Sequence, residues 1–223
     1  MADMPGFGEM DLGDRGGQPA HDYGDRCDVA PSNGLTPSQT IGPFFAYGLT
    51  PGSYGYAFRD IHSASIAGPE VAGESILIEG QVFDGNGAAA HDAMVELVQA
   101  DHTGLYADAP RNDGFTGYGR AGTGANGPAE TGGDTRFQFR TVKPGPTQPG
   151  AAPFVTLILT MRGLLNHCVT RVYFPEDDHA ADPVLSQVPA ERRHTLVATS
   201  LGEGRYRFDI HMQGENETSF FDV

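Results

Sequence analysis

Hydrophobic and polar residues alternate in several short stretches of the chain, with the period of two that is typical of β-strands. The clearest stretch covers residues 136–142 (RFQFRTV), in which Phe137, Phe139 and Thr141 lie on one side. Further stretches of this kind, or of continuous apolar residues, cover residues 75–83, 93–99, 154–161, 169–174 and 205–213. The pattern therefore predicts about six or more strands.

Details within these stretches refine the prediction. Residues 154–161 (FVTLILTM) are nearly all apolar, which predicts a strand buried on both faces. Residues 84–87 (DGNG) predict a hairpin-type turn, after which residues 93–99 run back with Met94, Glu96 and Val98 on one face. The glycine-rich residues 114–133 predict a long surface loop.

Helical periodicity is weak along the whole chain. Only residues 182–198, interrupted at Pro189, predict one or two short helices, and Asp182 followed by Pro183 suits an N-cap and a first helical position. Strands separated by Gly- and Pro-containing turns, with few helices, indicate an all-β fold, either a sandwich or a barrel.

The first 34 residues differ in composition from the rest of the chain. They hold seven acidic side chains, two arginines and seven glycines, with very few β-branched residues. A segment of this kind buries too little apolar surface to offset the entropy of ordering. The sequence therefore predicts a flexible acidic tail over residues 1–34 and one all-β domain over residues 35–223, which the family resemblance described below implies to be a β-sandwich.

The net charge of the chain limits the classes of partner that it can bind. Lys and Arg total 14 against 29 Asp and Glu, a formal net charge of −15. Such a chain repels phosphate backbones and anionic lipid, so we expect no nucleic-acid and no membrane partner. Residues 1–10 show neither a basic region nor an apolar run, and residues 154–161 are too few to cross a bilayer. We therefore expect a cytoplasmic protein.

Few residues form a recognisable catalytic pattern. No two of the eight histidines lie within four positions of each other, so no strand or helix offers a metal an adjacent His pair. Arg162 follows the apolar stretch 154–161 and precedes Gly163, which places it at a strand end. It could form a structural ion pair there or recognise a carboxylate through its guanidinium fork. Arg120 and Arg171 are similar candidates.

Seven segments, in order along the chain, resemble a known family. The chain is similar to the alpha subunits of the two-chain, protocatechuate-cleaving members of the intradiol ring-cleavage dioxygenases. The matching segments are TPSQTIGPFFAYGL (36–49), GQVFDGNG (80–87), VQADHTGLYAD (98–108), GYGRAGT (117–123), FRTVKPGP (139–146), MRGLLNHCVTRVYF (161–174) and RYRFDIHMQGENETSFFDV (205–223). They cover nearly everything from residue 36 onward.

The resemblance implies a fold, a partner and a reaction. The fold would be an intradiol-dioxygenase-type β-sandwich with long loops and one or two short helices. The partner would be a beta subunit that holds one non-haem Fe(III) through two tyrosines and two histidines. The complex would cleave protocatechuate with O2 to 3-carboxy-cis,cis-muconate.

The family pattern also implies roles for particular residues. The four iron-ligand positions of the beta subunit correspond here to Tyr106, Thr147, Phe154 and Thr156. One tyrosine cannot hold ferric iron alone, so we expect this chain to bind no metal and to contain no catalytic residue by itself. Thr40, Gly42, Pro43 and Arg162 match positions that line the substrate cleft of the neighbouring beta subunit.

Two other functions remain as alternatives. One is a homomeric catechol-type dioxygenase, which would need iron ligands other than the four replaced positions. The other is a non-catalytic β-sandwich binding module that keeps the fold without the chemistry.

Overall fold

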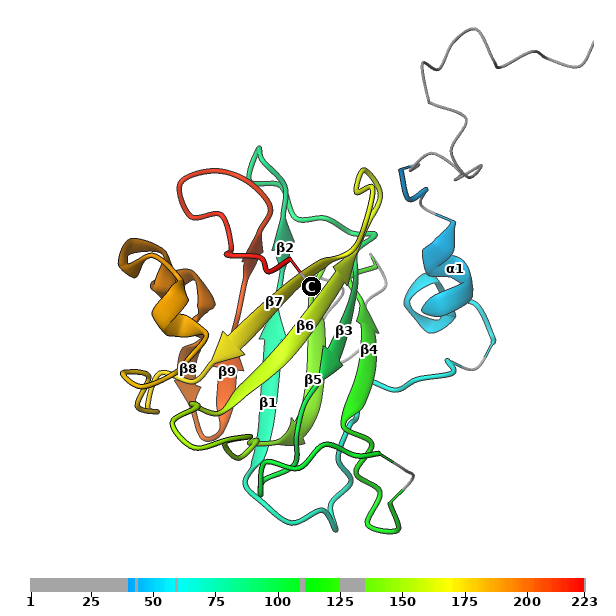
Figure 1. Cartoon of the computed structure of the whole chain (residues 1–223). Coiled ribbons are helices and arrows are strands. Elements are labelled where there is room, and N and C mark those ends of the chain that lie inside the picture. Colours follow the sequence, from blue (N-terminus) through cyan, green and yellow to red (C-terminus); the bar gives the residue numbers. More distant parts are fainter. Residues whose placement is uncertain (1–39, 43, 59, 109–110, 125–134, 223) are drawn as a thin grey trace, which may run out of the picture. The chain divides into compact units, whose positions relative to one another are not determined.

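The strands of the chain form an all-β sandwich (Figure 1). The computed structural model describes residues 40–42, 44–58, 60–108, 111–124 and 135–222, so the tail predicted over residues 1–34 lies outside the described residues. One four-stranded sheet has the order β5 (Phe137–Val142), β1 (Ser75–Gly80), β9 (Arg205–Arg207) and β8 (Thr199–Gly202). The second has the order β4 (Tyr118–Gly122), β3 (Met94–Val98), β6 (Phe154–Thr160) and β7 (Cys168–Tyr173).

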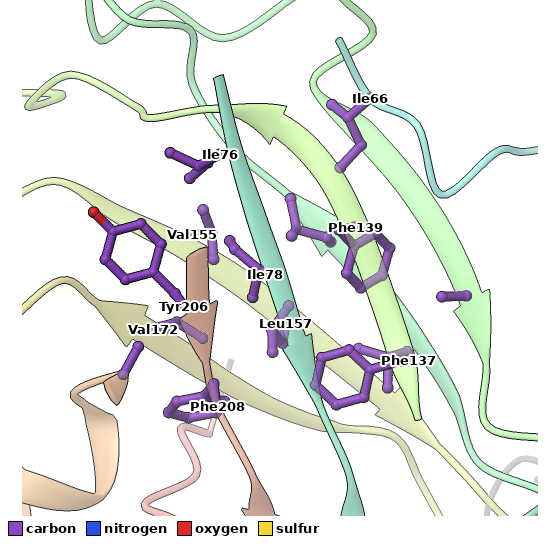
Figure 2. Close-up of a cluster of buried hydrophobic side chains, with 14 of the residues drawn as sticks. Ile66, Ile76, Ile78, Phe137, Phe139, Val155, Leu157, Val172, Tyr206 and Phe208 are labelled. Atoms are coloured by element: carbon purple, nitrogen blue, oxygen red, sulfur yellow. The ribbon is translucent and has the colours of Figure 1, made fainter. Parts of the chain in front are cut away.

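The main core lies between these two sheets (Figure 2). Residues of the central strands point inward, so β1 contributes Ile78, β5 contributes the alternate residues Phe137 and Phe139, and β6 contributes Val155 and Leu157. All five are 0% exposed. Burying one such side chain contributes about 1.5–3 kcal/mol, which makes this layer the main stabilising element of the sandwich.

The outer face of the second sheet is less buried than the sequence predicts. The apolar run in β6 predicts burial on both faces, but Thr156, Ile158 and Thr160 are only half-buried. Their neighbours on the inner face, including Leu157, are fully buried. This outer face therefore offers accessible side chains, and two positions expected from the family resemblance lie at or beside it.

Strand β4 lies inside the segment predicted as one long loop. Its glycines hide the strand pattern, but they are needed where other segments approach closely. A Cβ at Gly119 would lie 2.6 Å from Ile66 and 2.7 Å from the Ser63 carbonyl oxygen, and one at Gly122 would lie 2.8 Å from Ser53. The long-loop prediction is therefore wrong for residues 118–122, while residues 125–133 lie outside the described part.

Two predicted strands are interrupted. The stretch 75–83 divides into β1 and β2 (Val82–Phe83), and 205–213 divides into β9 and β10 (Ile210–His211). β1 pairs with β9 and β2 with β10, both in parallel. Between the paired segments, the backbone N–H of Gln81 donates to Asp209 Oδ1. After the turn, β3 does not run back along β1 but joins the second sheet, where it pairs with β4 and β6.

Short helices flank the sandwich. The sequence pattern misses α1 (Phe45–Leu49) and η1 (Pro51–Tyr54), because five and four residues are too short for a helical period. In residues 182–198 two 3₁₀-helices occur, η3 (Leu185–Gln187) and η4 (Ala190–Leu196). None of the helices in the described ranges is long and apolar enough to cross a bilayer.

Asp182 lies just before η3, whose N-cap is Val184 and not the predicted Asp182. Its Oδ1 accepts hydrogen bonds from the backbone N–H groups of Val184 and Leu185 and from the Tyr173 hydroxyl. Its Oδ2 accepts from the N–H of Ala152. Burial alone raises the pKa of this carboxyl, but these donors outweigh burial and lower it. The fully buried Asp182 thus fixes η3 beside a second, smaller hydrophobic cluster that contains Phe154, Tyr173 and Leu196.

Lys143, the single lysine of the chain, joins the ends of three strands. It follows β5, and its Nζ lies 2.6 Å from Glu176 Oε1 and 3.0 Å from Asp177 Oδ1, just beyond β7. The hydroxyl of Tyr206 in β9 donates to the same Glu176. Burial lowers the pKa of Lys143, but the two carboxylates outweigh it, and the pKa is raised.

Candidate functional site

The segment Thr40–Gly42 is tied to the turn that follows β6. The backbone N–H of Ile41 donates to the carbonyl oxygen of Leu164 at 2.8 Å. Thr40 and Gly42 are exposed, and no atom lies within 4 Å of the place where a Cβ on Gly42 would be. Pro43, the fourth residue expected at this edge, lies outside the described residues. The structure thus brings this segment close to the turn that contains Arg162.

Arg162 is at once ion-paired and exposed. Its Nε lies 2.8 Å from Oδ2 of Asp92, whose side chain is only 5% exposed. The Arg162 side chain itself is 53% exposed. The next residue, Gly163, has φ +88°, a conformation that favours glycine and turns the chain immediately after the arginine. The ion pair restrains Arg162 near Nε, although Asp92 Oδ2 has no hydrogen-bond partner, and among the described residues no contact occupies the terminal N–H groups of Arg162.

The aromatic side chain of Tyr54 in η1 lies close to the ion pair between Arg162 and Asp92. The hydroxyl of Tyr54 lies 3.5 Å from the carbonyl oxygen of His91, the residue before Asp92. Burial, followed by the negative charge of Asp92, raises the pKa of Tyr54 to about 12, so the phenol is neutral at physiological pH. The Tyr54 ring packs edge-on against Tyr47 at 4.9 Å between centroids. The rim, defined here as Thr40–Gly42, Asp92 and Arg162, therefore borders a neutral aromatic cluster.

Two of the positions that the family resemblance assigns to iron ligands, Phe154 and Thr156, lie on the outer face of β6 beside β7. Phe154 lies directly opposite Tyr173, and Thr156 directly opposite Arg171, in the antiparallel register. The guanidinium of Arg171 stacks over the Phe154 ring, 4.0 Å from its centroid, and its Nη1 lies 3.4 Å from the Tyr173 hydroxyl. A cationic side chain therefore lies among these positions.

Tyr106 and Thr147 belong to two loops that contact each other. Gly104 has φ +86°, and a Cβ there would lie 2.1 Å from the Pro146 carbonyl oxygen and 3.4 Å from Thr147 Cα. Tyr106 is half exposed. Burial raises the pKa of its hydroxyl, and the positive charge of the Arg171 guanidinium partly opposes that rise.

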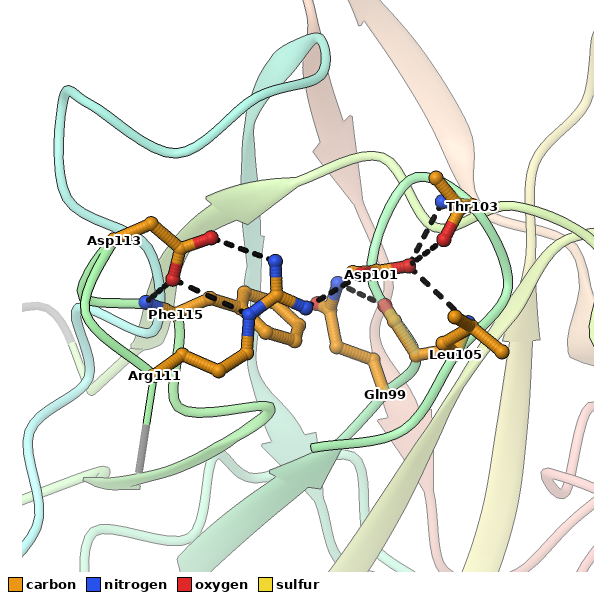
Figure 3. A network of polar contacts seen from close by, with 8 residues as sticks. Gln99, Asp101, Thr103, Leu105, Arg111, Asp113 and Phe115 are labelled. Atoms are coloured by element: carbon orange, nitrogen blue, oxygen red, sulfur yellow. Dashed lines mark hydrogen bonds and ion pairs between the residues drawn. The ribbon is translucent and has the colours of Figure 1, made fainter. Parts of the chain in front are cut away.

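Asp101 holds the loop that contains Tyr106 (Figure 3). Its Oδ1 accepts from the Thr103 hydroxyl at 2.7 Å and from the N–H groups of Thr103 and Leu105, while its Oδ2 accepts from Arg111 Nη1 at 2.5 Å. Arg111 also forms an ion pair with Asp113 at 2.6 Å. Burial alone would raise the pKa of Asp101, but these donors outweigh it and hold the pKa well below its usual range.

Acidification should weaken this loop in a defined pH window. Because the folded-state pKa of Asp101 is depressed, its stabilisation is complete above the unfolded value near pH 4 and is lost as pH falls toward the folded value. We expect Asp101→Asn to lower the free energy of unfolding by about 1–3 kcal/mol at pH 7 and by clearly less at pH 3. Urea unfolding of both proteins at several pH values measures the difference. A difference that is constant from pH 7 to pH 3 would contradict this role.

The residues at the four positions that the family resemblance assigns to iron ligands do not fit an iron ion. Phe154 has no donor atom, and Thr147 and Thr156 offer only neutral hydroxyls. Tyr106 could donate a phenolate, but burial raises the pKa of its hydroxyl. Arg171 adds a positive charge to the same region, which opposes a metal cation. Elsewhere in the described ranges, no group of three or more His, Cys, Asp or Glu is arranged to hold a metal.

Of the other two arginines considered from sequence, one is structural. Arg120 Nη2 lies 2.7 Å from Glu96 Oε1, and its side chain is only 12% exposed. Arg171 instead lies opposite Thr156 and stacks over the Phe154 ring. Asp92 was not identified from sequence, because its partner Arg162 is 70 positions away and no local pattern links them. The register between β6 and β7 would have placed Arg171 opposite Thr156, had that pairing been known.

Comparisons with known proteins agree with these observations. The model of the family described as Dioxygenase matches residues 59–214. The chain is 50% identical over 198 residues to the protocatechuate 3,4-dioxygenase alpha chain of Burkholderia cepacia, covering 84% of this chain and 97% of that one. It is 30% identical over 180 residues to the beta chain from the same organism, covering 72% and 73%.

A solved structure supports the fold. The 3-chlorocatechol 1,2-dioxygenase of Rhodococcus opacus 1CP matches with a TM-score of 0.51 and 19% identity, over 66% of this chain and 63% of that one. At that identity the likeness concerns the fold alone. The family model and the 50% identical relative each span more than two thirds of the chain and are therefore evidence of family membership. Together they show that this chain belongs to the intradiol ring-cleaving dioxygenase family.

Proposed function

We propose that this chain is the alpha subunit of a cytoplasmic, two-chain protocatechuate 3,4-dioxygenase. The complex with an iron-bearing beta subunit would cleave protocatechuate with O2 to 3-carboxy-cis,cis-muconate. The observation that supports this most strongly is the 50% identity to an alpha chain over 97% of that chain's length, against 30% to the beta chain of the same organism. The poor fit of Tyr106, Thr147, Phe154 and Thr156 to iron supports the same assignment.

Within that complex, the rim would complete the partner's substrate cleft. The Thr40–Gly42 backbone has an open side, and Ile41 is hydrogen-bonded to the turn after β6. The half-exposed Arg162 is held through Nε by Asp92, so its terminal N–H groups can contact the carboxylate of an aromatic acid. Pro43 would extend the same wall. In this proposal the rim binds and orients substrate, and the chemistry belongs to the partner's iron.

The Asp92 ion pair would also position Arg162 before substrate binds. A long, half-exposed side chain loses rotamer freedom when it binds a ligand. Asp92, with a side chain that is only 5% exposed, restrains the guanidinium in advance and so reduces that cost. The pair would therefore favour substrate affinity without placing any group of this chain at the reacting bond.

Iron content and colour test the assignment. We expect the chain purified alone to contain no stoichiometric iron and to lack the visible tyrosinate-to-iron absorption band. Co-expressed with its beta partner, the complex should show the band and protocatechuate-dependent oxygen uptake. One iron per chain in the lone protein would indicate a homomeric catechol-type enzyme, and a stable pair without oxygen uptake would indicate a binding module.

A further inference from the structure

Arg171 lacks a carboxylate partner in a chain that is rich in carboxylates. Arg111, Arg120, Lys143 and Arg162 form ion pairs, and Arg192 and Arg193 donate to backbone carbonyl oxygens. Arg171 forms none with any described residue, although the chain has 29 acidic side chains. Its contacts are the face of the Phe154 ring and the hydroxyl of Tyr173. This leaves guanidinium N–H groups without an acceptor from the described protein.

The surroundings hold Arg171 in a fixed position. Phe154, under the guanidinium, is 7% exposed and belongs to the smaller hydrophobic cluster. The Tyr173 hydroxyl donates to Asp182 and can therefore accept from Arg171 Nη1. This chain of contacts connects the guanidinium to the fully buried Asp182 carboxylate. A cation preorganised in this way loses little freedom when an anion binds.

Two further hydroxyl donors accompany Arg171. Thr156 lies directly opposite it in the register of β6 and β7, so both side chains lie on the outer face of the sheet. Tyr106 lies close enough for the guanidinium to influence the pKa of its hydroxyl. Neither hydroxyl donates a hydrogen bond to another described residue, and Tyr106 is 50% exposed. Arg171 and Thr156 thus share the outer face of the sheet, and the hydroxyls of Thr156 and Tyr106 have no hydrogen-bond acceptor among the described residues.

We propose that Arg171, Thr156 and Tyr106 form a binding site for the carboxylate of a small aromatic acid. A guanidinium fork matches the two oxygens of a carboxylate, and the hydroxyls can complete its hydrogen bonds. The exposed side chains of Tyr106 and Leu105 offer apolar surface to a ring. The net charge of −15 penalises a phosphate dianion more than a carboxylate monoanion.

The proposed site would bind an anion in a region where the family resemblance implies a metal cation. Beside Phe154 and opposite Thr156, two positions that the family resemblance assigns to metal ligands, this chain places the cationic side chain of Arg171, and we expect an anion to bind there instead. The inference rests on the contacts of Arg171 and does not depend on the proposed role in a two-chain enzyme.

A titration of the full-length chain, purified alone, with sodium benzoate tests the proposal. The tyrosines are labelled with ¹³C, and the ring signals of Tyr106 are identified by their loss in Tyr106→Phe. We expect benzoate to shift these signals saturably and Arg171→Gln to weaken binding by about tenfold or more. Arg205→Gln is the control, because Arg205 lies on the other sheet and is paired with Glu79. It should leave the affinity unchanged.

Other outcomes would overturn the site. They are the absence of a saturable shift, an affinity that Arg171→Gln does not change, or inorganic phosphate that binds as tightly as benzoate. Arg171→Lys keeps the charge without the planar fork and should bind benzoate more weakly than the wild type. It serves in place of Arg171→Gln if that variant does not fold, as judged by circular dichroism.

Discussion

Replacing Arg162 with alanine in the assembled two-chain complex should raise the KM for protocatechuate about tenfold and change kcat little. A charge-assisted contact to a carboxylate contributes about 1.5–3 kcal/mol, and about 1.4 kcal/mol corresponds to a factor of ten. Because Arg162 is 53% exposed, solvent screening favours the lower end of that range. Steady-state oxygen uptake at varied protocatechuate concentration measures both constants.

Two controls separate recognition of the substrate from damage to the fold. Arg205 is 52% exposed and also ion-paired, so Arg205→Ala removes a similar cation far from the rim and should leave KM unchanged. Arg162→Ala leaves the buried Asp92 without its partner, so Arg162→Ala with Asp92→Asn removes that unpaired charge. The double variant should keep the raised KM.

The substrate itself offers a sharper comparison. Catechol lacks the carboxylate, so its KM should be nearly the same for the wild type and Arg162→Ala. Unchanged KM for protocatechuate in the complex would show that Arg162 is only a structural ion pair. An equal rise for both substrates would point instead to a displaced Thr40–Gly42 segment.

The largest stability change should come from Asp182→Ala, which we expect to lower the free energy of unfolding by about 3–5 kcal/mol. The fully buried carboxylate accepts from three backbone N–H groups and from the Tyr173 hydroxyl, and alanine leaves all four donors unsatisfied. Urea unfolding of the full-length chain at neutral pH measures the loss.

Asp178→Ala is a matched control, since Asp178 also caps a nearby turn but does so in solvent. Its loss should stay below about 1 kcal/mol because water can replace the exposed acceptor. Asp182→Asn keeps two acceptor lone pairs on one oxygen and should be intermediate. Similar losses for Asp178→Ala and Asp182→Ala would show that the buried network contributes little.

The sequence predicts those parts of the fold in which a local pattern decides the structure. Alternation in residues 136–142 identifies β5, and the Asp182–Pro183 pair indicates where the helical turns begin, although the N-cap of η3 is Val184. The sequence pattern does not predict strand β4, because its Gly119 and Gly122 leave room for residues that lie far away in sequence. The pattern does not predict helix α1 either, because five residues are too few to show a helical period.

The residues of the candidate sites likewise divide into those that the sequence indicates and those that only the structure reveals. Family resemblance singles out Thr40, Gly42 and Arg162, and the structure adds the hydrogen bond between Ile41 and Leu164 that joins their segments. No local pattern indicates that Asp92 restrains Arg162, or that Arg171 stacks on Phe154. These contacts depend on strand register and on turns that bring distant residues together, which a single sequence does not encode locally.

The ion pairs of Lys143 make the chain suitable for a simple chemical measurement. Its ε-amino group is the only lysine amine among 223 residues, and the side chain is 16% exposed. Acylating reagents need a free, deprotonated amine, so they would modify Lys143 only when the contacts with Glu176 and Asp177 open. The rate of acylation, followed by mass spectrometry, would therefore report how often the structure opens locally where β5, β7 and β9 meet.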